Sequence, residues 1–375
     1  MRSFFFMALT LCVGCGTIEV SPGSPEEERE ASYGEEDTLS LEVEAGDSDE
    51  PSEPHGELGD SAEGPDDTFG PDGLEMPVED VMADASAADV GSETEPDVGP
   101  ETEPDVGFDA PLYPDLPETL EASIYTKMEA AKVPGLSACV IKEEAIYWCG
   151  GFGKANLALD RDVSAHTPFL LASISKTFTA ALVIQLRDEG AFDLDEDLDT
   201  LLGWDVAHPL YDLPLTMFQL LTHTSGIDDN WGAMGDFYGY DEDPPMSLQE
   251  AVEGYFQPEG PWYDAASNFT SDAPGASVHY SNMGVALAGH MVELASGQSF
   301  AKRSRDTLFE PLGLENTGIF LADFPSSEGL AMPYKWVSEA YVPTGHYTFA
   351  DYPNGGIRSS AYDLARFLLM HIRGG

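Results

Sequence analysis

The sequence predicts an α+β (α/β) fold for residues 116–375, with an antiparallel sheet beside a helical subdomain. Three observations predict it. From about Leu116 the composition becomes globular, with aromatic, β-branched and periodically spaced apolar residues. After one helical segment come two strand-like segments, and a mainly helical stretch follows them. The residues before Leu116 have a different, strongly acidic composition, so we set them apart from the folded domain.

The acidic charge is concentrated before the folded region. Residues 1–126 contain 35 acidic and 2 basic residues, and the heptapeptide ETEPDVG occurs twice. Such a segment buries too little apolar surface to offset its ordering entropy. We therefore expect residues 16–115 to be a disordered acidic linker that acts as a spacer, with calcium buffering or an acidic activation role as the alternative. Its negative field argues against nucleic acid and anionic lipid headgroups as partners.

Residues 1–15 have the pattern of a signal peptide. A basic residue precedes an apolar run of about ten residues, which is too short to span a bilayer. Gly14 directly before Cys15 resembles a bacterial lipoprotein signal, in which Cys15 would carry the lipid, although Cys12 stands where such signals prefer leucine. The alternative is a plain secretory signal. Either signal predicts export to the periplasm or cell surface, with membrane contact only through a lipid on Cys15.

The first elements of the folded region are a helix and a hairpin. Residues 121–132 have helical periodicity and are followed by a Pro-Gly stop signal. Residues 136–153 are typical of two strands that turn around Glu144. Such a turn places Cys139 directly opposite Cys149 on one face. In an oxidising compartment the pair can form a disulfide, and the alternative is two small buried apolar residues.

The later elements are mainly helices. Residues 173–189 carry an apolar stripe and are followed by a glycine, so they predict a helix. Another helix is expected to run to about Ser296 and to be capped by Gly297. Ser360 and Asp363 have the spacing of a capping box for a final helix.

Ser173 and Lys176 form a Ser-x-x-Lys motif at the start of the first of these helices. Residues three apart on a helix lie on one face, so the lysine can reach the serine hydroxyl. A partly desolvated lysine has a lowered pKa and can take the serine proton. The alternative is that Ser173 caps the helix while Lys176 is an exposed surface residue. The motif alone does not decide between the two.

A second motif, VHYSNMG at 278–284, places Tyr280 and Asn282 at the entrance to a later helix. The phenol can share a proton with a lysine and a serine, and the amide can bind both a lysine and a substrate carbonyl. The alternative is a buried tyrosine with a satisfied hydroxyl, and Asn282 as the helix N-cap.

Four blocks in order resemble the β-lactamase-related serine hydrolases, a family of class C β-lactamases, D-alanyl-D-alanine carboxypeptidases and esterases. The blocks are FLLASISKTFTAALVIQLRDEGAFDLDEDL, LTMFQLLTHTSGI, YSNMGVALAGHMVELASG and YPNGGIRSSAYDLARFL. The resemblance extends from about Leu116 to the last residue. It implies the serine β-lactamase and penicillin-binding-protein fold. The glycines of YPNGG, Gly355 and Gly356, would then form a tight turn near the site, consistent with positive φ.

The resemblance also implies a mechanism. Ser173 would be the acylated nucleophile, Lys176 its proton partner, Tyr280 the general base and Asn282 a substrate contact. His223, in the His-Thr-Ser-Gly block, would be structural. The serine would attack an amide, ester or β-lactam carbonyl of a small-molecule or peptidoglycan-peptide substrate, and water would release the acyl group.

No metal or cofactor is expected. The sequence has no Cys/His cluster with zinc spacing and no Gly-rich nucleotide loop. Residues 193–199, DLDEDLD, have the aspartate spacing of a calcium loop but lack its glycine.

One family motif does not occur up to Gly375. The family carries Lys-Thr-Gly or His-x-Gly on an edge strand that follows the YPNGG block, and this strand supplies one of two oxyanion-hole N–H groups. Losing one such donor costs about a hundred- to a thousandfold in rate. We therefore expect a domain that lacks its C-terminal strands, as the partial product of a longer gene. The alternative is a catalytically inactive, lipid-anchored binding protein.

Overall fold

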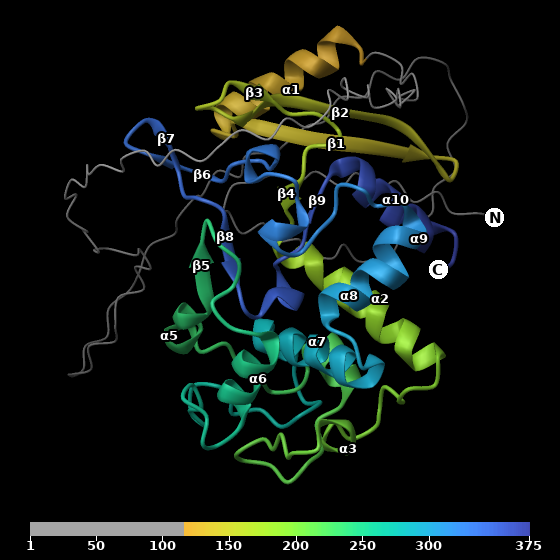
Figure 1. Cartoon of the computed structure of the whole chain (residues 1–375), viewed down its shortest axis with the longest axis vertical. Coiled ribbons are helices and arrows are strands. Elements are labelled where there is room, and N and C mark those ends of the chain that lie inside the picture. Colours follow the sequence, from red (N-terminus) through yellow and green to blue (C-terminus); the bar gives the residue numbers. More distant parts are fainter. Residues whose placement is uncertain (1–115) are drawn as a thin grey trace, which may run out of the picture. The chain divides into compact units, whose positions relative to one another are not determined.

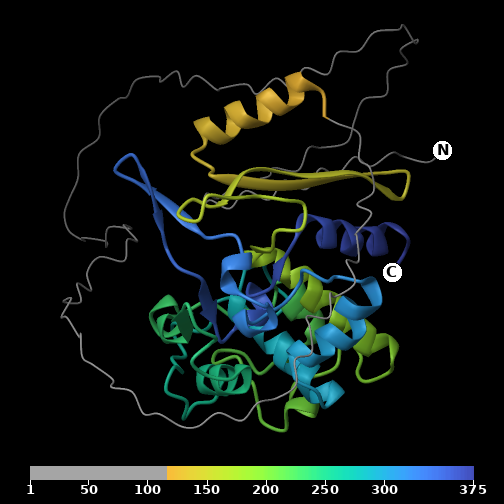
Figure 2. The same ribbon diagram turned by 45° about the horizontal axis from the view of Figure 1, so that its top comes forward.

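The structure is a computed structural model that describes residues 116–375. The predicted signal peptide, Cys15 and the acidic linker lie outside the described residues. The described part is an α+β fold, as the sequence predicts. Helix α1 (Glu118–Ala130) covers one face of the sheet, and α10 (Ala361–Ile372) lies against the other (Figures 1 and 2).

The sheet contains a long hairpin, β1 (Gly135–Lys142) and β2 (Ala145–Asn156), and the short strand β3 (Arg161–Asp162). Among the described strands, β1 pairs with β2 alone, so its other edge has no strand partner. A small core cluster that includes Met128 of α1 and Phe152 of β2 joins the helix to the sheet.

The hairpin reaches the expected cysteine pairing by a route that the sequence did not indicate. Glu143 and Glu144 both have positive φ, 54° and 61°, as a two-residue turn of a twisted hairpin requires. This turn alone would place Cys139 opposite Trp148. A β-bulge between Val140 and Ile141 shifts the register by one residue, so Cys139 lies opposite Cys149. The two form a disulfide.

Removal of this disulfide is expected to lower the free energy of unfolding by about 2–3 kcal/mol. The bond joins residues 10 positions apart, and a cross-link of that length restricts the unfolded chain by about this amount. Urea unfolding of the wild type, with and without reductant, and of the Cys139→Ala, Cys149→Ala double variant measures the effect. The reduced wild type should unfold with the double variant. Coincident oxidised and reduced midpoints would contradict the prediction.

Helices α2 (Ser175–Asp188) and α7 (Asn282–Ser296) pack together in the centre of the helical region (Figure 1). Phe178 of α2 is fully buried and stacks on Phe367 of α10 with ring centroids 3.8 Å apart. Helix α7 is buried along most of its length, as its largely apolar sequence requires. Gly297 ends it with φ 64°, as expected, but Ser281 rather than Asn282 is its N-cap.

The other elements pack around these two helices or beside the sheet (Figure 1). The helices are α3 (Asp199–Leu202), α4 (Met217–Leu221), α5 (Trp231–Met234), α6 (Leu248–Phe256), α8 (Phe300–Ser304) and α9 (Glu310–Leu312). The paired strands are β4 (Phe169–Leu170) with β9 (Arg358–Ser359), β5 (Tyr238–Tyr240) with β8 (Tyr347–Phe349), and β6 (Tyr334–Val337) with β7 (Ala340–Pro343). At α10, Ser360 accepts from the Asp363 N–H, but the Asp363 carboxylate binds Asn316 and Thr317 instead of completing a capping box.

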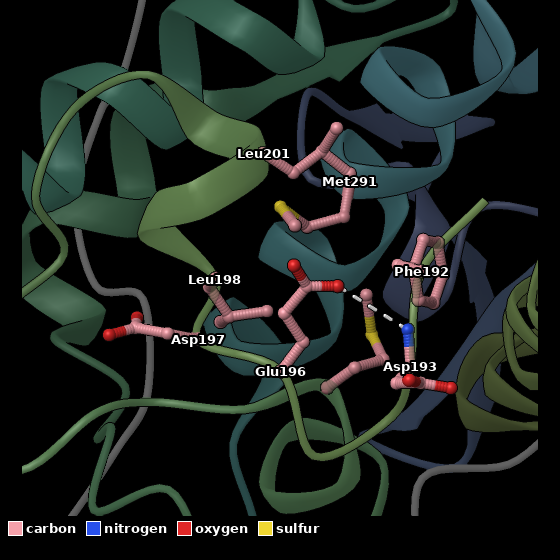
Figure 3. A pocket seen from close by; sticks show the side chains of 8 residues that line it. Phe192, Asp193, Glu196, Asp197, Leu198, Leu201 and Met291 are labelled. Carbon is pink, nitrogen blue, oxygen red and sulfur yellow. Dashed lines mark hydrogen bonds between the residues drawn. The ribbon is translucent and has the colours of Figure 1, made fainter.

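A small cavity lies between the acidic loop 193–199 and α7 (Figure 3). Its volume is about 10 Å³, room for about one water molecule. It is lined by Phe192, Asp193, Glu196, Asp197, Leu198, Leu201, Met217 and Met291. None of the predicted catalytic residues lines it, and within residues 116–375 no group of acidic, His or Cys side chains is arranged to hold a metal ion. No helix in this same range is long and apolar enough to cross a bilayer.

Candidate active site

Ser173 lies in a 3₁₀ turn, η1 (Ala172–Ile174), that connects β4 to α2. The turn is held at both ends. The Leu171 N–H donates to the Ile357 carbonyl at 2.8 Å, and the Ile357 N–H donates to Ser175 Oγ at 3.1 Å. Ala172 has φ 47°, a left-handed conformation that is uncommon for a residue with a Cβ. The result is an exposed Ser173 side chain at the start of α2.

Lys176 lies one turn further along and is largely buried. Its Nζ donates to Asn282 Oδ1 at 2.7 Å, to the Asn354 carbonyl at 2.8 Å and to Ser173 Oγ at 3.3 Å. Burial lowers the pKa of Lys176 to about 8, although the carboxylates of Asp229 and Asp351 oppose this. The alternative interpretation of Lys176 as a solvated surface residue is therefore wrong.

Tyr280 brings a second titratable group to the serine. Its hydroxyl donates to Ser173 Oγ at 2.7 Å, and Lys176 Nζ lies 4.8 Å from the centre of its ring. The ring is half exposed. Burial raises the pKa of the phenol, and the hydrogen bond to Ser173 partly offsets this. Ser173, Lys176 and Tyr280 thus form one hydrogen-bonded group, in which a proton can pass between three side chains.

Asn282 is held by both ends of its amide. Its Oδ1 accepts from Lys176, and its Nδ2 donates to Asp229 Oδ2 at 2.8 Å. Asp229 was not among the residues that the sequence singled out. Its carboxylate also accepts from the backbone N–H groups of Asn282 and Met283 and from Ser281 Oγ. It therefore binds the positive end of α7 and orients the asparagine that contacts Lys176.

The fully buried Tyr255 fixes the loop that carries Asp229. Tyr255 of α6 donates its hydroxyl hydrogen to the Asp228 carbonyl at 2.9 Å and accepts from the Asn230 N–H at 2.8 Å. These bonds hold the residues on each side of Asp229, so its carboxylate stays in line with the first turn of α7.

The YPNGG block contributes a backbone carbonyl. Pro353 and Asn354 lie in the turn η6 (Tyr352–Asn354), which Thr179 of α2 anchors by donating to the Pro353 carbonyl at 2.7 Å. The expectation of positive φ at the glycines is wrong. Gly355 has φ −166°, an extended conformation open to any residue.

Close packing explains the two glycines. A Cβ on Gly355 would lie 3.0 Å from the Phe349 ring, and one on Gly356 would lie 2.6 Å from Tyr352 Cβ. A side chain at Gly356 would collide with Tyr352, the first residue of η6, and one at Gly355 would crowd the Phe349 ring.

His223 lies beside the site without touching Ser173. Its ring centroid is 4.5 Å from that of Tyr280, and its Nδ1 accepts from the Ser281 N–H at 3.2 Å. Its backbone carbonyl accepts from the His279 N–H at 2.7 Å. Burial, together with the charge of Lys176, lowers the pKa of His223, so the ring is neutral at pH 7. These contacts fix the segment that carries Tyr280.

The family model for beta-lactamases matches residues 120–375, the range that contains every residue of this site. The chain belongs to the beta-lactamase family. Penicillin-binding protein 4* of Bacillus subtilis is 28% identical over 236 residues, 58% of this chain and 47% of that protein. The D-aminopeptidase of Gluconobacter oxydans is 28% identical over 198 residues, 52% of this chain and 34% of that protein. The chain thus spans about half or less of the length of these curated relatives.

A solved structure shares the fold. The octameric penicillin-binding protein homologue from Pyrococcus abyssi superimposes with a TM-score of 0.54 at 28% identity, covering 68% of this chain and 56% of that one. The fold of the described residues is therefore that of the serine β-lactamases and penicillin-binding proteins.

Proposed function

We propose that this protein is a serine hydrolase that acts through an acyl-enzyme on Ser173. The observation that carries the proposal is the contact of Ser173 Oγ with two proton carriers, Tyr280 OH at 2.7 Å and Lys176 Nζ at 3.3 Å. A serine hydroxyl becomes a nucleophile when an adjacent base removes its proton.

Loss of one proton from the Ser173, Lys176 and Tyr280 group would prepare it for attack. With Lys176 neutral or Tyr280 ionised, Ser173 can donate its proton instead of only accepting hydrogen bonds. The Oγ–carbon bond then forms, the bond to the leaving group breaks, and the proton taken from Ser173 passes to the leaving group. Water attacks the resulting ester, with the same groups as base, and frees Ser173.

The proposed substrate is an amide, ester or β-lactam carbonyl in a small molecule or a peptidoglycan peptide. The amide of Asn282 supports this class, because Asp229 takes one of its two N–H bonds and the other can bind a substrate carbonyl. Family membership supports it also, since the relatives include a penicillin-binding protein and a D-aminopeptidase. We further propose that the enzyme is exported and anchored through Cys15.

Intact mass of the purified chain after exposure to a fluorophosphonate, and separately to benzylpenicillin, tests this function. The wild type should gain the mass of one phosphonyl group, and Ser173→Ala should gain none. Ser267→Ala is the matched control, because Ser267 is also exposed and its hydroxyl forms no hydrogen bond with a lysine or tyrosine of residues 116–375. A penicillin adduct would narrow the substrate to β-lactams and the peptides that they mimic.

Circular dichroism should first show that all three proteins are folded. An adduct that persists in Ser173→Ala would overturn the assignment of the nucleophile. A folded wild type that reacts with neither probe would overturn the assignment as an enzyme and favour the alternative of an inactive binding protein.

A further inference from the structure

A carboxyl group lies buried behind the candidate site with incomplete hydrogen bonding. Asp351, just before η6, is 2% exposed. Its Oδ2 accepts from Asn354 Nδ2, and its Oδ1 has no hydrogen-bond partner among residues 116–375. Burial of a carboxylate with an unpaired oxygen costs stability. Its presence here therefore points to a role other than stabilising the fold.

The partner of Asp351 is also the partner of Lys176. Asn354 donates from its side chain to Asp351 and accepts at its backbone carbonyl from Lys176 Nζ at 2.8 Å. The Asn354 N–H donates to the Asp351 carbonyl at 3.1 Å, which closes the turn. The Asp351 carboxylate therefore fixes Asn354, whose carbonyl holds Lys176. The hydrogen bonds run in order from Asp351 through Asn354 and Lys176 to Ser173.

We propose that Asp351 is a positioning residue for the reaction, holding Asn354 against Lys176 and supplying the negative charge that keeps this buried lysine able to carry a proton. The proposal rests on the serine hydrolase function proposed above. Asp351 touches neither Ser173 nor a substrate carbonyl bound there, so it acts through Asn354 and Lys176.

The charges around the pair support this role. Lys176 faces two carboxylates, Asp229 from the loop before α5 and Asp351, and both raise its pKa against the effect of burial. Asp351 interacts with Lys176, with Asp229 and with two phenols, Tyr238 of β5 and Tyr255 of α6. Burial raises the pKa of Asp351 to about 6, and Lys176 opposes the rise. Above about pH 6 the Asp351 carboxyl is therefore mainly ionised, and its charge acts on Lys176 over a distance.

The effect of the Asp351 charge on stability distinguishes a carboxylate kept for function from one that stabilises the fold. A carboxyl whose pKa is higher in the folded state destabilises the fold once pH rises above its unfolded pKa. Asp351→Asn removes this charge, keeps an oxygen to accept from Asn354, and should leave the melting temperature at pH 8 unchanged or higher. A carboxyl whose charge stabilised the fold would instead give a lower melting temperature on this substitution.

The decisive measurement is the pKa of Lys176, read from the ¹³Cε resonance of labelled lysine in the full chain. The Lys176 signal is assigned by its absence in Lys176→Met. In Asp351→Asn the pKa of Lys176 should fall, because a negative neighbour is lost. The rate of fluorophosphonate labelling should rise with pH as Lys176 loses its proton, and the midpoint of this ascending limb should fall with the pKa of Lys176. At pH above this limb, labelling should be slower, because Asn354 is held less firmly.

Asp363→Asn is the matched control. Asp363 is 1% exposed, and its Oδ2 accepts from the Asn316 N–H at 2.7 Å and from Thr317 Oγ1 at 2.9 Å. Lys176 is not among the groups that shift its pKa. Burial raises the pKa of Asp363 as well, so this control is judged on Lys176 alone: Asp363→Asn should leave the pKa of Lys176 unchanged.

The outcomes distinguish this proposal from the enzyme assignment. An unchanged pKa of Lys176 in Asp351→Asn overturns the positioning role, and so does a variant that fails to fold. If the wild type does not react with the probe but the pKa of Lys176 falls in Asp351→Asn alone, the hydrolase assignment fails while the link between Asp351 and Lys176 stands.

Discussion

Lys176→Met is expected to slow the acylation of Ser173 by about two to four orders of magnitude, the usual contribution of a positioned general acid or base. Methionine fills a similar volume but can neither take a proton nor donate to Asn282 and Asn354. With pKa about 8, Lys176 is the first of the three coupled groups to lose its proton as pH rises. Wild-type acylation should therefore increase with pH through about 8.

The labelling rate of Lys176→Met should not show this increase through pH 8, because the remaining phenol of Tyr280 has a raised pKa. The second-order rate constant for fluorophosphonate labelling between pH 6 and 9.5 measures both effects. Lys154→Met is the control, since Lys154 forms ion pairs with Asp160 and Asp162 on the sheet and has no contact with Ser173. A labelling rate for Lys176→Met of about one tenth of the wild-type rate or more would rule out the proton-carrier role.

Asp229→Asn is expected to lower the free energy of unfolding by about 2–3 kcal/mol and to slow acylation as well. The carboxylate accepts only, and every group that it contacts at α7 is a donor: the Asn282 and Met283 N–H groups, Asn282 Nδ2 and Ser281 Oγ. An asparagine brings an NH₂ group among these donors, so at least one donor loses its acceptor. The loss also removes a negative charge from a helix N-terminus.

Urea unfolding and the same labelling assay test this prediction. Asp228→Asn is a matched control from the next position, because the Asp228 side chain is 38% exposed and its carboxylate contacts His279 and the Asp229 N–H rather than α7. Loss of stability equal to that of Asp228→Asn would show that the contacts at the helix end contribute little. Normal acylation in a destabilised Asp229→Asn would show that Asn282 keeps its orientation without this carboxylate.

The sequence predicted the parts of the site that depend on local spacing. Ser173 and Lys176 are three residues apart at a helix start, and helical geometry brings Nζ within 3.3 Å of Oγ. The cysteine pairing was predicted from a turn at the right place, although the actual register depends on a bulge that the sequence does not mark. Side-chain patterns of this kind are visible in one sequence because neighbours along the chain are neighbours in space.

The missed features depend on contacts between distant segments. Asp229 lies in a loop 53 positions before Asn282, and nothing in GIDDN distinguishes it from ordinary turn residues. Asn354 contributes a backbone carbonyl, which no side-chain pattern reveals. The glycines after it were interpreted as conformational, but they are required by the nearby Phe349 and Tyr352 side chains. Each case needs the packed tertiary structure before the role becomes visible.

The distances in sequence between the groups that meet at Lys176 have a consequence for the order of folding. Asn282 lies 106 residues from Lys176, and Asn354 lies 178 residues from it. Contacts between such distant residues form late, since closure of a long loop must precede them. Helix α2 and its serine can exist early, but the lysine obtains its partners only when α7 and η6 have docked. Nucleophilic reactivity of Ser173 should thus arise at the end of folding, and a nascent or partly folded chain carries the serine in an inert state.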